Sequence, residues 1–347
     1  MKTVQLKIRA EEAGPDHPAI IEAAAILIRG GLVAIPTETV YGLAANALDP
    51  SPIARIFEAK ERPSWDPLIV HVANLDMISR VAIDFPEKAR KLAERFWPGP
   101  LTLLLRRQAR LPVIVTAGRE TVAIRMPAHP VAQAVIASVG VPLAAPSANR
   151  FGHTSPTTAE HVLRDLDGRI DAVLDSGPTQ IGVESTVLDP LRTPPLLLRP
   201  GGITREQLED LVGPIEVYSA PANQAPQALA SPGLAARHYA PEARMILVEG
   251  NAEQFRATLE EQVSKLGDGD YVGAMVPESW LDEHSLSRGG LVIFDWGPWS
   301  DPARLAHNLF AGLRYLDKPG VSVIVCPLPA ANGLGLALRD RLLRAAQ

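Results

Sequence analysis

A chain of 347 residues is longer than one hydrophobic core usually supports, so about two domains are expected. Hydrophobic residues make up 46% of the chain and charged residues 21%, which is typical of a globular protein and excludes a disordered or fibrous one. The net charge of −5 argues against a protein whose main task is to coat nucleic acid or an anionic membrane.

The distribution of charge, the single cysteine and the N-terminus add to this picture. From Arg55 to Arg125 there are 13 Lys or Arg against 8 Asp or Glu, so this segment is locally basic. Because Cys326 is the only cysteine, an intramolecular disulfide and a multi-cysteine zinc site are excluded, and a reducing compartment is expected. We expect Cys326 to be a small buried hydrophobic residue. "MKTVQLKIRA" lacks the pattern of a signal peptide, and no run approaches about 18 apolar residues. We therefore expect a cytoplasmic protein.

The first two thirds of the chain alternate between helical and strand patterns. An amphipathic helix from His17 ends at Gly30 and Gly31, and a short buried strand follows at 32–35. Residues 49–63 suit a helix closed by a proline, and 67–73 suit a strand. The alternation continues through residues 87–107, 122–127, 129–149, 157–177, 184–190 and 195–213. This order predicts an α/β layer architecture, in which the connections allow a mixed sheet.

The pattern changes after Gly213 and then resumes. Residues 217–241 are rich in Ala, Pro, Ser and Gln without periodicity, which indicates a linker or lid. Strands and helices alternate again from about Arg244, which predicts a smaller, Rossmann-like α/β domain. We expect a catalytic domain at 1–215, a linker or lid at 216–241 and an accessory domain at 242–347.

The usual nucleotide-binding signatures are missing from this chain. No Gly-Lys dipeptide occurs, which excludes a Walker A loop, and "GLGLAL" lacks the third glycine of a dinucleotide fingerprint. A phosphate site would have to be built from side chains. Lys60 and Arg62 are candidates, since an extended chain after Lys60 projects both cations from one face. The alternative is a solvated surface pair, which is the commoner meaning of this spacing.

Polar residues recur where predicted strands end. Examples are Thr37 and Glu38 in "IPTETVYGLA", Arg125 in "VAIRMP", Ser147 and Asn149 in "APSAN", Glu184, Ser185 and Thr186 in "GVESTVLDP", and Arg199 in "LLLRPGGIT". Singly, these have ordinary explanations, because Ser and Asn form turns and Thr with Glu can cap a helix. Together, they predict a concave polar site on one face of a sheet.

These motifs occur in the order found in a known family. The stretches are "PTETVYGL", "AKERP" followed by "PLIVH", "GPLTLLL", "VAIRMPAHPVA", "APSAN", "GVESTVLD", "LRPGGIT" and "SPGLAARHYAP". They closely resemble the two-domain threonylcarbamoyl-AMP synthases of the YrdC-like family. The resemblance implies a YrdC-like twisted mixed sheet, flanked by helices and with an open concave face. "NGLGLALRDRLLRAA" is similar to the end of the family's accessory C-terminal domain.

The resemblance also implies a reaction. L-threonine, bicarbonate or CO2, and ATP would form L-threonylcarbamoyl-AMP with release of pyrophosphate, the first step of N6-threonylcarbamoyladenosine modification of tRNA. Mg2+ would accompany ATP, although no metal ligands are implied. A partner, a tRNA threonylcarbamoyl transferase, would receive the product, so direct RNA binding is not required.

Individual positions match the family's functional residues. Those matching the tetrad that holds the ATP phosphates are Lys60, Arg62, Ser147 and Asn149. Further positions matching the ATP site are Thr121, Ser155, Arg199 and Tyr239. Those matching the threonine site are Thr37, His71, Arg125 and Ser185. Arg125 is the natural partner of the threonine carboxylate, in a charge-assisted pair.

Two positions depart from the family pattern. Asp66 stands where family members commonly have an asparagine that contacts ATP, and a carboxylate there repels phosphates unless it binds Mg2+ or turns away. Asp66 is therefore not among the expected ATP-binding residues. Glu61 replaces the usual glycine after the lysine, and we expect its side chain to face solvent.

Two other functions are consistent with parts of this pattern. A double-stranded RNA-binding module is one, because isolated domains of this fold are concave with a basic surface, but the net charge and the complete threonine set oppose it. Carbamoyl-adenylate formation in hydrogenase maturation is the other. Its related domains belong to much larger chains, and this chain has no acylphosphatase-like or zinc-finger region.

Overall fold

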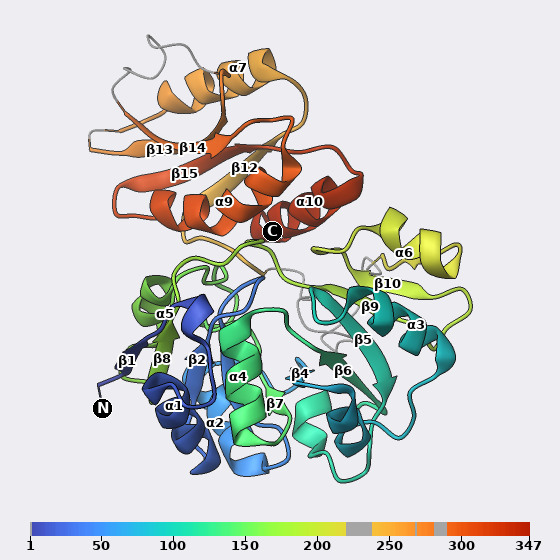
Figure 1. Ribbon diagram of the computed structural model, residues 1–347. Helices are drawn as coiled ribbons and strands as arrows, with labels where there is room; N and C mark the ends of the chain where they lie inside the picture. The colour runs from blue at the N-terminus through green and yellow to red at the C-terminus, as the bar shows by residue number, and fades with distance from the viewer. Residues whose placement is uncertain (1, 220–237, 268, 281–289) are drawn as a thin grey trace. The chain divides into compact units, whose positions relative to one another are not determined.

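The computed structural model describes residues 2–347 except 220–237, 268 and 281–289 (Figure 1). The chain divides into two compact units. The first contains Met1–Phe151, Ser155–Gln180 and Glu184–Ala235, and the second contains Gly152–Thr154, Ile181–Val183 and Ala236–Gln347. Most of the segment expected to form a linker or lid lies outside the described residues. The expected domain limits remain a prediction.

The N-terminal unit is built on an 11-stranded sheet. Its strands follow the order β1 (Val4–Lys7), β8 (Ala172–Asp175), β2 (Val33–Ile35), β3 (Gly42–Asn46), β7 (Leu143–Ala144), β4 (Ile69–His71), β6 (Thr121–Arg125), β5 (Leu101–Arg106), β9 (Thr186–Asp189), β10 (Leu196–Arg199) and β11 (Glu216–Val217). Strand β6 pairs in parallel with β4 and antiparallel with β5. The predicted mixed sheet is therefore confirmed.

Helices of this unit begin and end at the signals that the sequence contains. They are α1 (Pro18–Ile28), α2 (Pro50–Lys60), α3 (Glu87–Phe96), α4 (Pro130–Val139), α5 (Ala159–Leu166) and α6 (Arg205–Val212), with 3-10 turns at η1 (Ala10–Glu12), η2 (Leu75–Arg80) and η3 (Val113–Thr116). Both α1 and α4 start with His-Pro. The imidazole Nδ1 of His17 and His129 accepts from a backbone N–H in the first turn, while the proline preorganises that turn. These two helices pack against each other.

The C-terminal unit contains a four-stranded parallel sheet in the order β12 (Arg244–Val248), β15 (Val321–Pro327), β13 (Tyr271–Pro277) and β14 (Leu291–Gly297). Helix α7 (Ala252–Val263) covers one face, and α9 (Pro302–Leu316) and α10 (Gly333–Ala345) cover the other (Figure 1). Helices on both faces of a parallel sheet confirm the Rossmann-like prediction. Cys326 is buried in β15, as expected of a small hydrophobe.

None of the helices in the described part of the chain is both long and apolar enough to cross a membrane.

The end of α2 differs from the extended chain considered for Lys60 and Arg62. Lys60 is the last helical residue, and Glu61 adopts a left-handed conformation with φ of 53°. The N–H of Arg62 then donates to the carbonyl of Phe57, which closes the helix end. A left-handed residue at this place explains why glycine suits it. The Glu61 side chain faces solvent, as predicted, and forms ion pairs with Arg150 and Arg169.

Replacing Glu61 tests whether this turn is strained. Glu61→Ala removes both ion pairs and keeps the left-handed Cβ strain, whereas Glu61→Gly removes the ion pairs and the strain together. We expect the melting temperature of the glycine variant to exceed that of the alanine variant by about 2–4 °C. Differential scanning calorimetry measures the difference, and an alanine variant as stable as the glycine variant would contradict a strained turn.

Candidate active site

A row of polar side chains crosses the middle strands of the N-terminal sheet. His71 at the end of β4 is the register partner of Arg125 at the end of β6. Arg125 is in turn the partner of Thr102 on β5. Register partners on neighbouring strands point to the same face, so these three side chains share one face of the sheet. All three are buried, with exposures of 3% or less.

Arg125 is held by acceptors on three sides. Its Nε donates to the carbonyl of Gly99 at 3.2 Å, and its Nη1 donates to Thr39 Oγ1 at 2.8 Å. Its Nη2 is 2.7 Å from Glu38 Oε1, in an ion pair whose two side chains are about 95% buried. Such a pair offsets the cost of desolvating the guanidinium. Glu38 lies in the loop between β2 and β3, so its alternative role as a helix cap is wrong.

The polar row extends from Thr102 to β10 through Ser185. Thr102 Oγ1 and Ser185 Oγ are hydrogen-bonded at 2.8 Å. Arg199, at the end of β10, donates from Nε to the Ser185 carbonyl at 3.1 Å and from Nη2 to Ser185 Oγ at 3.2 Å. Ser185 and Arg199 are also buried. The structure thus brings together four of the expected residues: His71, Arg125, Ser185 and Arg199.

Thr37 and His71 complete the expected threonine set. Thr37 Oγ1 donates to the Val40 carbonyl at 2.6 Å and lies 2.8 Å from Thr39 Oγ1, which also accepts from Arg125. Burial lowers the pKa of His71 to about 3, and the neighbouring Arg125 cation adds to this shift. His71 is therefore neutral near pH 7, and its Nδ1 has no hydrogen-bond partner among the described residues. A neutral imidazole with a free ring nitrogen is suited to a polar ligand.

The residues expected to bind the ATP phosphates also lie close together. Lys60 contacts the backbone carbonyls of Ser147 and Asn149 rather than their side chains. Lys60 Nζ donates to the carbonyls of Ser147 and Asn149, at 2.6 and 2.5 Å. The turn that carries these two residues is fixed to β3 by a bridge between Ser147 and Gly42. Lys60 is 1% exposed, and burial, followed by the nearby Arg62 cation, lowers its pKa well below the usual value. The surface-pair alternative is therefore wrong for Lys60.

Arg62 is buried beside Lys60 and has a carboxylate partner. Its Nη2 is 2.9 Å from Asp66 Oδ2 and donates to the Pro67 carbonyl at 2.6 Å, and its Nε donates to the Asp66 carbonyl at 3.2 Å. Both side chains are at most 4% exposed. The Asp66 side chain points toward the cations. The alternative that it turns away from the phosphate site is therefore wrong. Burial raises the pKa of Asp66, and the cations of Arg62, Lys60 and Arg199 oppose the shift.

The remaining expected residues lie in different places. Thr121 begins β6, two residues before Ala123, the register partner of Ile69. It shares a face with Arg125, four residues and about 13 Å along the strand. Ser155 Oγ donates to Glu184 Oε1, and both residues are buried. Tyr239 belongs to the C-terminal unit, where it packs on Phe310, and its role at ATP stays a prediction.

Three residues of this site were given no substrate-binding role from the sequence, although Glu38 was among the polar residues that predicted the site. Glu38 and Thr39 contact Arg125, and Thr102 connects Arg125 with Ser185. A signal for Thr102 is present in "LTLLL", where one hydroxyl interrupts an otherwise apolar strand. Glu38 was visible as a charge between two threonines in an otherwise apolar stretch. Neither signal identifies the partner, because each partner comes from a distant part of the chain.

The residues that the structure describes contain no cluster of three His, Cys, Asp or Glu able to hold a metal ion.

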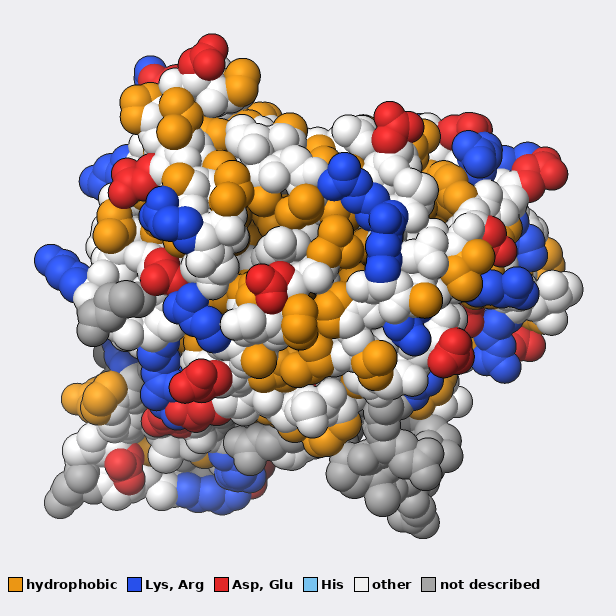
Figure 2. All heavy atoms as spheres, turned by 90° about the horizontal axis from the view of Figure 1, so that it is seen from below, with side chains coloured by type: hydrophobic (Ala, Val, Ile, Leu, Met, Phe, Trp, Pro, Cys, Tyr) orange, Lys and Arg blue, Asp and Glu red, His pale blue; other side chains and the backbone are white. Residues whose placement is uncertain are grey.

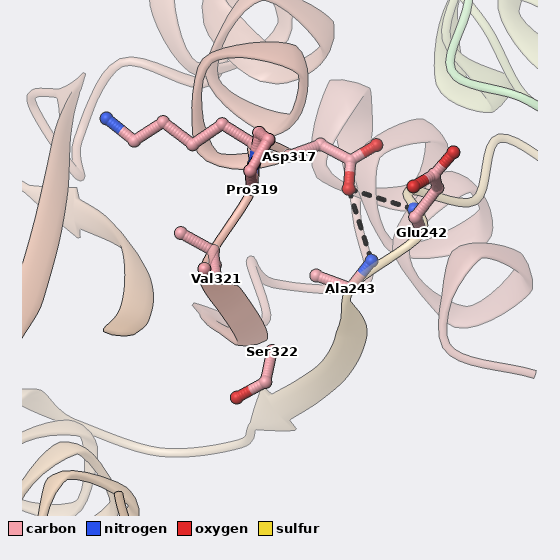
Figure 3. Close-up of a pocket in the computed structure, with 8 residues that line it drawn as sticks. Glu242, Ala243, Asp317, Pro319, Val321 and Ser322 are labelled. Carbon is pink, nitrogen blue, oxygen red and sulfur yellow. Dashed lines mark hydrogen bonds between the residues drawn. The ribbon is translucent and has the colours of Figure 1, made fainter. Parts of the chain in front are cut away.

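In the C-terminal unit, a hollow of about 450 Å³ is bordered by Glu242, Ala243 and residues 317–322 (Figure 3). There, Asp317 accepts from the backbone N–H groups of Glu242 and Ala243. The hollow is at the amino ends of parallel strands β12 and β15, whereas ligands of α/β sheets bind at the carboxyl ends. We assign no ligand to it.

The surface in Figure 2 bears on the RNA-binding alternative. On that face, basic and acidic side chains are interspersed, and hydrophobic side chains gather near the centre. A protein that grips double-stranded RNA needs a basic surface along the phosphates. The face shown has no continuous basic stripe, so it does not favour this alternative.

Two family models match the chain. One, described as "Telomere recombination", matches residues 25–201. The other, described as "Threonylcarbamoyl-AMP synthase, C-terminal domain", matches residues 203–347. Together they match nearly all of the chain from residue 25 onward.

Curated relatives and a solved structure are similar over nearly the whole chain. The threonylcarbamoyl-AMP synthase of Pyrococcus abyssi is 44% identical over 324 residues, which is 93% of this chain and 92% of that protein. That of Bacillus subtilis is 44% identical over 337 residues, or 97% and 95%. The crystal structure of P. abyssi Sua5 complexed with L-threonine has a TM-score of 0.87 and 40% identity, and the alignment covers 100% of this chain and 98% of that one.

The neutral state of His71 predicts a pH dependence of stability. Its pKa is about 3 when folded and about 6.5 when unfolded, so between these values the unfolded chain binds one more proton. The free energy of unfolding therefore falls as the pH is lowered from 6.5. Replacing His71 with Gln should reduce this slope by up to about 1.4 kcal/mol per pH unit.

Urea denaturation of the wild type and of His71→Gln at pH 7.0, 6.0 and 5.0 measures the two slopes. Other titrating groups contribute equally to the pH dependence of the two proteins, so their contributions cancel in the comparison. Identical slopes would show that His71 takes up a proton in the folded state.

Proposed function

This chain belongs to the threonylcarbamoyl-AMP synthase family, and from that premise we propose which residues carry out its reaction. The protein is an L-threonylcarbamoyladenylate synthase, a nucleotidyltransferase that joins L-threonine, bicarbonate or CO2, and ATP and releases pyrophosphate. The observation that carries the assignment of residues is the pair of buried cationic centres in the N-terminal unit, one at the end of α2 around Lys60 and Arg62 and the other on the sheet around Arg125.

Lys60, Arg62, Ser147 and Asn149 form the proposed phosphate end. Two cations with less than 10% exposure favour an anionic ligand, because a buried positive charge gains more from an anion than an exposed one does. Arg62 offers a planar fork to phosphate oxygens, and Lys60 offers a single ammonium. Charge that develops on the departing pyrophosphate is stabilised here, which lowers the barrier to its departure.

Arg125 forms the centre of the proposed threonine end. Its guanidinium binds the substrate carboxylate, while Ser185, Thr37 and the neutral His71 bind the other polar groups. Glu38 and the Gly99 carbonyl hold the guanidinium in one orientation. A fixed orientation removes part of the entropic cost of binding and aligns the amine for reaction.

The two ends are separated by about the length of one strand. Thr121, proposed as an ATP contact, and Arg125 share one face of β6 at a spacing of about 13 Å. Threonine bound at one end and ATP at the other bring the amine toward the α-phosphorus between them. The amine captures CO2, a carbamate oxygen attacks the α-phosphorus, and pyrophosphate leaves. This chemistry needs no nucleophilic side chain, so the protein contributes positioning and charge stabilisation.

Further parts of the proposal concern the ATP site, the metal, the partner and the compartment. Ser155, Arg199 and Tyr239 are the additional residues proposed for ATP. Mg2+ would be bound mainly by phosphate oxygens and water, since the described residues form no acidic cluster for it. The product passes to a tRNA threonylcarbamoyl transferase in the cytoplasm. A reactive mixed anhydride of this kind requires an acceptor reaction soon after release.

The phosphate end is tested by Lys60→Ala and Arg62→Ala. Each should lower turnover about tenfold to a hundredfold, because each removes a charge that acts where the leaving group develops charge. Pyrophosphate release with ATP, Mg2+, bicarbonate and L-threonine is the measurement. Lys91→Ala, at an exposed lysine of α3, is the matched control and should keep normal turnover. Near-normal release by Lys60→Ala would refute this assignment.

The threonine end is tested by substrate choice. A site that hydrogen-bonds the threonine hydroxyl rejects valine strongly, because valine leaves a buried polar group unpaired. Serine loses only a methyl contact, which costs about 1 to 3 kcal/mol. In a pyrophosphate assay with each of the 20 amino acids, serine should be the best of the wrong substrates. Equal use of valine and serine would mean that the pocket is not polar.

A further inference from the structure

Arg62 has an internal anion in the place where the proposed function requires a phosphate. The 2.9 Å ion pair to Asp66 is between side chains that are 4% and 0% exposed. Water therefore does little to screen it, and the attraction is stronger than at the surface. A phosphate group that binds Arg62 has to compete with this carboxylate.

The position of Arg62 does not depend on the Asp66 charge. Its Nε and Nη2 donate to the carbonyls of Asp66 and Pro67, which are backbone groups. On another side, the guanidinium carbon is 6.0 Å from the centroid of the Phe151 ring, and Trp65 packs edge-on against that ring at 5.9 Å. These contacts hold the guanidinium in place without the carboxylate.

Asp66 is compensated mainly by charge. Neither of its side-chain oxygens accepts a hydrogen bond from a described residue, although the side chain is fully buried. A buried carboxylate in this condition is costly unless a cation is beside it. Arg62 is the cation nearest to Asp66 in this site, and the two charges neutralise each other.

We propose that Asp66 acts as the counter-ion of Arg62 whenever the phosphate subsite is empty, and thereby weakens binding of triphosphate and pyrophosphate. The proposal rests on the assignment of Lys60 and Arg62 to the phosphates. When ATP enters, its phosphates replace the carboxylate as the main partner of Arg62. When pyrophosphate leaves, the carboxylate takes its place, so the cation is never left buried and unpaired. A weaker hold on pyrophosphate favours release of this product.

The test compares Asp66→Asn with the wild type by isothermal titration calorimetry of the full-length protein. The probes are inorganic tripolyphosphate and pyrophosphate. Asparagine keeps the shape of the side chain and removes its charge. We expect Asp66→Asn to bind both probes about 5- to 50-fold more tightly than the wild type. Asp76→Asn, at an exposed carboxylate of η2, is the matched control and should bind like the wild type. Equal or weaker binding by Asp66→Asn would overturn the proposal.

A kinetic measurement separates this role from a purely structural one. Asp66→Asn should show a lower KM for ATP and stronger product inhibition by pyrophosphate, each by a similar factor. A structural role would lower stability and leave the inhibition constant of pyrophosphate unchanged. Should Asp66→Asn fail to fold, Asp66→Ser carries the same expectation and the same refuting result.

Failure of this inference can be distinguished from failure of the proposed function. If the phosphate assignment holds but Asp66 has no such role, Lys60→Ala loses turnover while Asp66→Asn binds pyrophosphate like the wild type. If the assignment itself is wrong, Lys60→Ala keeps normal turnover as well. Either result overturns the proposal for Asp66.

Discussion

The desolvation cost of a buried cation is the constraint on which the rest of this site depends. Lys60, Arg62, Arg125 and Arg199 are all at most 7% exposed. Each is compensated within the protein: Lys60 by two carbonyls, Arg62 by Asp66, Arg125 by Glu38, and Arg199 by Ser185. The chain has no Walker A phosphate loop, and in the proposed function these side chains replace the backbone N–H groups that bind phosphate in such loops. These internal partners offset the cost of desolvating the four cations.

Strand order determines how these cations are arranged. The central strands follow the order β4, β6, β5, β9 and β10, which places His71, Arg125, Thr102, Ser185 and Arg199 in one polar row although up to 128 positions separate them. Within this row, His71 and Arg125 are direct register partners on neighbouring strands. Thr121 begins the strand β6 that Arg125 ends. The strand therefore fixes the spacing between Arg125 and Thr121, the residues proposed for the two substrates.

The same physics accounts for the two departures from the family pattern. Glu61 takes a left-handed position that favours glycine, and its two surface ion pairs give only partial compensation, because solvent screens them. Asp66 takes a position next to Arg62, where burial makes its charge effective. One substitution faces water and affects mainly local stability. The other is fully buried, and its charge lies 2.9 Å from Arg62, which is proposed to bind phosphate.

The sequence by itself determined the local and chemical part of this structure. Proline and histidine pairs start α1 and α4, and apolar runs form the strands. Arg125, Ser147 and Arg199 were visible as polar groups at the ends of apolar runs, and Lys60 and Arg62 as a closely spaced pair of cations. Only the tertiary structure decided the pairings, including Arg125 with Glu38, Ser185 with Thr102, and Lys60 with the carbonyls after β7. It also decided that Lys60 ends a helix and that Glu38 caps none. The reason is physical: helix starts and burial follow from neighbours in the chain, whereas the partner of a buried charge depends on which distant strand lies beside it.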